Sequence, residues 1–163
     1  MKRRHVPPPD TKRALGGWLL LLALAFVALP IRLLLFIWED LLPAFSREAW
    51  PLLTTPGSPA YHPLNKPILL FELIGNSLTL LGALVVASLF FLRHRRFPLL
   101  GVVFLALAVA FYVADYFITR QLPLVAEQSG SESKLDLIGA LLVGVAVSTY
   151  LLVSKRVKET FVR

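Results

Sequence analysis

The chain has no cysteine and little charge for its length. Without a thiol it can form no disulfide, thiolate zinc site, iron–sulfur cluster or cysteine nucleophile. Charged residues make up 17% of the 163 residues, against about 25% in soluble domains, whereas hydrophobic residues make up 56%. The mean hydropathy is +0.70. A soluble core of this size cannot bury so much apolar surface, so the composition predicts an integral membrane protein.

Motifs that carry catalysis are also missing. The sequence has no nucleophile elbow, Walker A loop, dinucleotide-binding glycines or HExxH pair, and His62 stands at no metal-ligand spacing from Glu39, Asp40 or Glu48. We therefore predict no catalytic residue, no cofactor and no metal site. The net charge of +7 does not indicate nucleic-acid binding, because the basic residues flank apolar runs. The expected partners are the lipid bilayer and either another membrane protein or a second copy.

Four apolar segments are each long enough to cross a bilayer, which takes about 20 residues. The sequence predicts an all-α integral membrane protein, a four-transmembrane-helix bundle with spans at about 16–37, 67–92, 98–118 and 137–153. Pro67 and Pro98 each stand at a helix start, where the missing N–H costs least. The transmembrane domain covers 16–153, between a basic N-terminal segment, 1–15, and a basic tail, 154–163.

The distribution of charge predicts the orientation. One set of flanks holds twelve of the 17 basic residues and only two acids. By the positive-inside rule both termini and the 93–97 turn lie in the cytoplasm of a bacterial inner-membrane protein, and the 38–66 and 119–136 segments face outward. A cleaved signal peptide is disfavoured because the first apolar run is too long and contains Arg32. The basic residues counted are Lys2, Arg3, Arg4, Lys12, Arg13, Arg93, Arg95, Arg96, Lys155, Arg156, Lys158 and Arg163.

The outward loop, 38–66, is too long for a plain linker. Leu41, Leu42, Phe45 and Trp50 follow a helical spacing with charges between them, which predicts a short interfacial amphipathic helix over about 40–50. Prolines break the rest of the loop into turns. The loop either caps the bundle or lines a pocket above it. The outward-loop candidates are Trp50, Thr54, Thr55, Tyr61 and His62. Of these, Thr54, Thr55 and His62 would line such a pocket together with Ser58, whereas Trp50 and Tyr61 would belong to an aromatic belt at the outer interface.

Three ionisable residues lie inside the predicted spans: Arg32, Glu72 and Asp115. Counting about 1.5 Å per residue from the span boundaries places all three in the outer leaflet. Each shares a helix face with small or polar residues, the face expected to meet neighbouring helices. We therefore predict an intramembrane polar cluster in which Arg32 pairs with Glu72, Asp115 or both, with Asn76 beside them. Such a cluster is either a structural staple or a working site such as a proton relay.

Six segments carry a family resemblance: GGWLLL at 16–21, WPLLTTPGSPAYHPL at 50–64, FELIGN at 71–76, RRF at 95–97, ADY at 114–116 and SKRVKETFV at 154–162. By these the chain resembles the bacterial membrane proteins of domain-of-unknown-function family 2569. It departs from that pattern at Asn65, where tryptophan often follows YHPL, and at 147–150, where the family often has Trp-Ile-Pro-Tyr. The resemblance implies four inner-membrane helices and no particular activity.

Three functions are compatible with these features. The first is a non-catalytic envelope component, meaning a subunit, assembly factor or regulator, which would co-purify with one stoichiometric partner. The alternative is a small-solute or ion permease, which would give flux in liposomes and would have to oligomerise, because four helices are few for alternating access. The third is a membrane-embedded enzyme using Glu72, Asp115 or His62 as an acid or base, which would form a lipid product.

Overall fold

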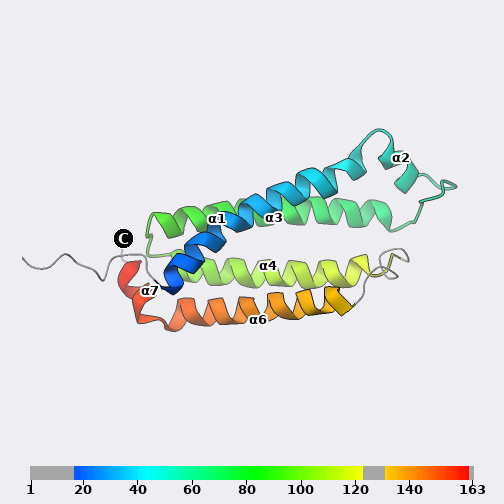
Figure 1. Ribbon diagram of the computed structural model, residues 1–163. Helices are drawn as coiled ribbons and strands as arrows, with labels where there is room; N and C mark the ends of the chain where they lie inside the picture. Colours follow the sequence, from blue (N-terminus) through cyan, green and yellow to red (C-terminus); the bar gives the residue numbers. More distant parts are fainter. Residues whose placement is uncertain (1–16, 123–130, 162–163) are drawn as a thin grey trace, which may run out of the picture.

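Four long helices make up the molecule. The structure, a computed structural model, describes residues 17–122 and 131–161. Helices α1 (Trp18–Phe36), α3 (Asn65–Phe91), α4 (Phe97–Thr119) and α6 (Ser131–Val153) run alongside one another (Figure 1). Each belongs to an apolar helical stretch long enough to cross a membrane. The predicted all-α bundle with four spans is therefore confirmed, although α6 begins six residues earlier than expected.

The first span extends well beyond its predicted end at residue 37. Helix α1 continues without a break into a π-helical turn, η2 (Ile37–Leu41), and a 3₁₀ turn, η3 (Leu42–Phe45). The apolar span is consequently Trp18–Phe45, 28 residues long. Leu41 is buried, which keeps this extension on the bundle. The chain turns away only at Ser46, whose backbone is extended.

A short helix between the first two spans is confirmed, but its predicted bounds of 40–50 are wrong. Helix α2 covers Ala49–Thr54 and packs near the start of α3. The residues up to Phe45 belong to the first span, because the helical hydrogen bonding continues through the turn at Leu41 instead of stopping at Trp38. The apolar residues do lie in helical segments, but the break between these segments, at Ser46, falls in the middle of the predicted helix.

Close glycine contacts fix how α3 and α4 pack. A Cβ built on Gly75 would lie 2.0 Å from Cε2 of Phe111, and one built on Gly82 would lie 3.0 Å from the Phe104 ring. Only glycine therefore lets these rings approach the α3 backbone. The two contacts set an antiparallel register in which Gly75 lies opposite Phe111 and Gly82 lies opposite Phe104.

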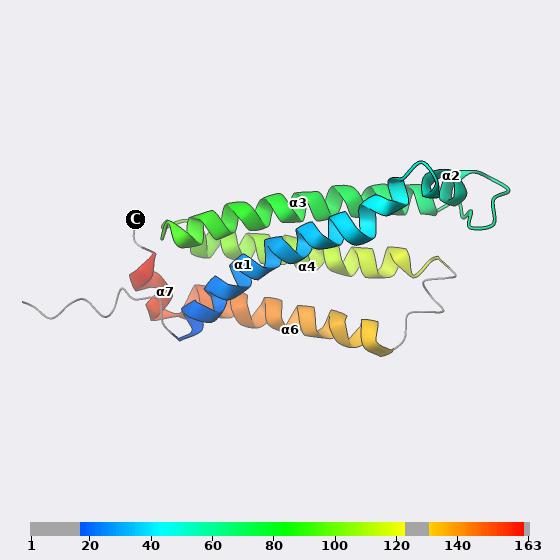
Figure 2. The same ribbon diagram turned by 45° about the horizontal axis from the view of Figure 1, so that its top comes forward.

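Helix α1 crosses the bundle obliquely. It begins near α7 (Lys155–Thr160) and the end of α6, and it finishes beside the start of α3 (Figures 1 and 2). Its main helix partner is α3. In both views α1 therefore diverges from α6 toward the end of the bundle that carries α2.

An aromatic cluster closes the opposite end of the bundle. The Phe90 ring lies 5.3 Å from that of Phe26 and 5.2 Å from that of Phe97, and Phe161 packs 4.4 Å from Phe97. Phe161 follows α7, which is held against the bundle by the fully buried Val157. The chain predicted as a basic tail thus contributes residues to the core.

Candidate functional site

Glu72 and Asp115 face the same part of the α3–α4 interface. The antiparallel register set by Gly75 and Phe111 places Glu72 about one turn from the contact on α3 and Asp115 about one turn from it on α4. Both side chains are half-buried, and their carboxyl groups interact electrostatically. Oδ1 of Asp115 is buried and has no hydrogen-bond partner among the described residues. Glu72 and Asp115 therefore lie within electrostatic range of each other, but the predicted Arg/Glu/Asp cluster is not seen among the described residues.

Neighbouring polar side chains donate to the backbone near these acids. Asn76 is buried, and its Nδ2 donates to the carbonyl oxygen of Glu72 at 2.9 Å. The Thr119 hydroxyl donates to the carbonyl oxygen of Asp115 at 2.7 Å. Asn76 therefore lies one turn from Glu72 on α3, and its amide hydrogen bond goes to the helix backbone.

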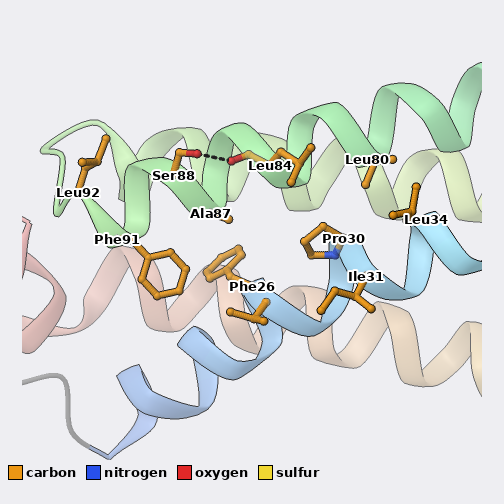
Figure 3. A pocket seen from close by; sticks show the side chains of 11 residues that line it. Phe26, Pro30, Ile31, Leu34, Leu80, Leu84, Ala87, Ser88, Phe91 and Leu92 are labelled. Atoms are coloured by element: carbon orange, nitrogen blue, oxygen red, sulfur yellow. Dashed lines mark hydrogen bonds between the residues drawn. The ribbon is translucent and has the colours of Figure 1, made fainter.

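The predicted place of Arg32 in the cluster is wrong. Its side chain is exposed, and no ion pair joins it to Glu72 or Asp115 in the described part of the chain. Pro30 and Leu34 lie across from Leu84 and Leu80 (Figure 3). Leu80 is eight residues beyond Glu72 on α3, which is about 12 Å along the helix axis.

The longer first span explains this error in depth. The span runs from Trp18 to Phe45, so Arg32 lies fourteen residues from one end and thirteen from the other. The prediction counted fifteen residues from Gly17 along a span that ended at residue 37, and so placed Arg32 in the outer leaflet. Arg32 therefore lies near the middle of the first span.

The predicted packing face of α1 is also wrong. The small residues that share a face with Arg32 are exposed, and the opposite face carries the buried large residues. That face is buried because the Phe26 ring packs against Phe90 and Phe97. The exposed set is Leu21, Ala25, Ala28 and Arg32, and the buried set is Leu19, Leu22, Ala23 and Phe26.

Tyr112 lies within electrostatic range of several charged residues. It is 37% exposed and interacts electrostatically with Arg32, Asp115 and Asp136. Sequence reasoning missed Asp136, an exposed residue of α6, because the fourth span was set to begin at residue 137. The sequence did contain a signal that the helix begins earlier, because Asp136 stands just before the apolar run and acidic residues are favoured in the first turn of a helix.

The candidate residues of the outward loop form local contacts. The Thr54 hydroxyl donates to the carbonyl of Trp50 at 2.7 Å, and the Trp50 ring stacks on Phe45 with centroids 5.0 Å apart. His62 accepts from the backbone N–H of Leu64 through Nδ1. Tyr61 is half-buried, and Thr55 is exposed at the end of α2. The contacts of Trp50, Thr54 and His62 are thus made within the loop and the end of the first span.

Asn65 is the loop's main polar anchor, and sequence reasoning treated it only as a departure from a pattern. It is 8% exposed, and its Nδ2 donates to the carbonyls of Leu53 at 3.0 Å and Ala60 at 2.9 Å. This amide ties two arms of the loop to the first residue of α3. The sequence contains one signal of this role, namely that Asn65 stands where a proline-rich loop meets an apolar helix. Side-chain amides at such positions commonly form hydrogen bonds with the loop backbone.

The chain can now be assigned to a family. The sequence profile described as "Protein of unknown function (DUF2569)" matches residues 12–162. The chain belongs to the DUF2569 family. The match covers the four spans, the loop with α2, and α7, so all of these are parts of one DUF2569 unit. No curated protein and no solved structure matches the chain.

Proposed function

We propose that the protein is a non-catalytic component of a bacterial inner-membrane complex, acting as a subunit, assembly factor or regulator. The observation that carries this proposal is the exposed Arg32 near the middle of the first span, with no ion pair to Glu72 or Asp115. Placing a charge at mid-membrane costs at least about 2.5–3.5 kcal/mol on insertion scales. An acid on a neighbouring protein would offset that cost.

The surroundings of Arg32 suit a helix as that neighbour. Ala25 and Ala28 are exposed on the same face of α1. Small residues at such spacing let a second helix approach closely, and close approach strengthens an interhelical ion pair. The proposed partner is therefore a transmembrane helix that carries a carboxylate level with Arg32. A second copy is a poorer fit on this face, because a twofold axis along the membrane normal would bring two arginines together.

The experiment uses the absence of cysteine. A photocrosslinker attached at Ala28→Cys should yield one defined protein adduct in membranes, and the same probe at Leu107→Cys should not. Leu107 is a matched control because it is 67% exposed on α4. Arg32→Leu should lose the adduct, Arg32→Lys should keep it, and Arg32→Glu should regain it when the partner's acid is changed to arginine. Equal adducts from all variants, or none from the wild type, would overturn the proposal.

An ion or solute permease is the second candidate, favoured by the acid pair. Two carboxyl groups in one half-buried site repel unless a cation or proton lies between them, and Oδ1 of Asp115 has no protein partner among the described residues. Purified protein in liposomes should then conduct protons or a small cation, and Asp115→Asn should abolish flux while the protein still folds. Flux that is equal in wild type and variant would remove this candidate.

A further inference from the structure

An apolar groove runs between α1 and α3 (Figure 3). Its volume is about 670 Å³, and it is open at its side because wall residues such as Ile31, Leu84 and Phe91 are half-exposed. On one wall Pro30 interrupts the α1 hydrogen bonding, since proline has no N–H. On the other wall Ser88 donates its hydroxyl to the carbonyl of Leu84 at 2.8 Å, which leaves the lining apolar.

The length of the groove matches one leaflet of a bilayer. On α3 and its C-terminal cap the lining runs from Leu80 to Leu92, twelve helical steps or about 18 Å. The hydrocarbon core of a bilayer is about 30 Å thick, so one leaflet is about 15 Å. The groove thus extends from the α3–α4 turn to about the middle of the membrane, which is the reach of a lipid acyl chain.

Arginines gather where the groove meets the α3–α4 turn. Arg93 directly follows the last lining residue, Leu92, and Arg95 and Arg96 are exposed in the same turn. The α3 helix ends in a Schellman motif, in which the N–H of His94 bonds the carbonyl of Leu89 and the N–H of Arg93 bonds that of Phe90. Arg93 occupies the left-handed position of this motif, with φ 54°. Glycine usually fills that position, so an arginine there is strained and points to a use for its side chain.

We propose that this groove and turn bind one anionic phospholipid, with an acyl chain along the groove and the headgroup phosphate on Arg93, Arg95 and Arg96. The guanidinium group suits a phosphate because it donates two parallel hydrogen bonds to it. The choice of an anionic lipid rests on this charge complementarity at the mouth of an apolar channel. The site is separate from the proposed partner face, because Arg32 does not line the groove.

Native mass spectrometry of the full chain in detergent tests the headgroup. We expect wild type to bind phosphatidylglycerol more tightly than phosphatidylcholine with the same acyl chains. A basic residue at a lipid surface changes affinity about fivefold, so Arg95→Gln with Arg96→Gln should weaken phosphatidylglycerol binding about 25-fold. Lys66→Gln with Lys134→Gln removes two exposed charges at the other end of the bundle and should change little. Equal wild-type affinity for both lipids would overturn the proposal.

Two further variants separate binding from folding. Arg93→Gly relieves the left-handed backbone, so it should keep or raise the melting temperature while lowering phosphatidylglycerol affinity about fivefold. Leu84→Trp fills the groove, whereas the control Val85→Trp changes an adjacent exposed residue outside it. Leu84→Trp should weaken lipid binding at least tenfold relative to Val85→Trp. Unchanged binding in Arg93→Gly, or equal binding by the two tryptophan variants, would refute the site.

Discussion

The contact between Gly75 and Phe111 makes the most direct prediction about what holds the acid pair in place. In Gly75→Ala the new Cβ would meet three ring atoms of Phe111, at 2.0, 2.4 and 2.7 Å. Ordinary carbon contacts are about 3.5 Å, so the ring would have to move by about 1.5 Å. It cannot move freely, because it packs 5.2 Å from the Phe71 ring. Overpacking of this kind costs about 1–3 kcal/mol.

The helix preference of alanine opposes that cost. Replacing glycine by alanine inside a helix gains about 1 kcal/mol, so the net loss in Gly75→Ala is about 2 kcal/mol at the upper end of the overpacking range. At about 2–4 °C per kcal/mol, the melting temperature in detergent should fall by about 4–8 °C. Thermal unfolding followed by circular dichroism measures it.

A second glycine and a second-site change test the reasoning. Gly139 lies inside α6 with nothing within 4 Å of a built Cβ, so Gly139→Ala should leave the melting temperature unchanged or higher. Adding Phe111→Leu to Gly75→Ala removes the ring atoms that clash and should recover more than half of the loss. If Gly75→Ala proves as stable as Gly139→Ala, or if Phe111→Leu gives no recovery, close packing at Gly75 does not set the α3–α4 register.

Three more predictions concern other parts of the chain. Phe161→Ala removes a buried ring from the aromatic cluster, at a cost of about 3–5 kcal/mol. A Val157→Cys reporter should then react with maleimide in the variant and stay protected in the parent, and equal protection would contradict a docked α7. Asn65→Ala leaves the Leu53 and Ala60 carbonyls without their donor, at a cost of about 1 kcal/mol per hydrogen bond. A protease should therefore cut this variant faster than the parent within 55–60, whereas it should cut the control Lys66→Ala at the parent rate. If both ends are cytoplasmic, alkaline phosphatase fused after Lys158 should be inactive and a fusion within 56–60 active; activity at both sites would rule out the proposed topology.

The sequence predicted the spans well and their internal alignment poorly. Apolar length alone identifies α3 and α4 to within about two residues, because nothing else in the chain can occupy hydrocarbon. It does not say where a helix stops when a π-helical turn carries it onward, as between Ile37 and Leu41. That one continuation moved Arg32 from the predicted outer leaflet to mid-span.

The candidate site was predictable in part for a similar reason. Counting residues from the ends of two antiparallel helices places Glu72 and Asp115 near the same end of the bundle. Depth alone does not show which groups pair, and the predicted cluster with Arg32 is not seen among the described residues. The face of α1 was misjudged because small residues were assumed to face inward, whereas the aromatic contacts of Phe26 bury the large ones. Which face of α1 is buried depends on the shape of the neighbouring helices, and the sequence of α1 alone does not contain that information.

The aromatic cluster also bears on when this protein can finish folding. Phe26 comes from the first helix and Phe161 from residues that follow the last one, yet both pack on Phe90 and Phe97. Contacts between such distant parts of a chain form late, since the intervening segment must be ordered first. As translation proceeds from the N-terminus, Phe90 and Phe97 await a partner that is made only after the last of the four long helices. The bundle therefore closes at this end only after α7 has been made, and a chain truncated before α7 would expose the cluster to the quality-control machinery that inspects new membrane proteins.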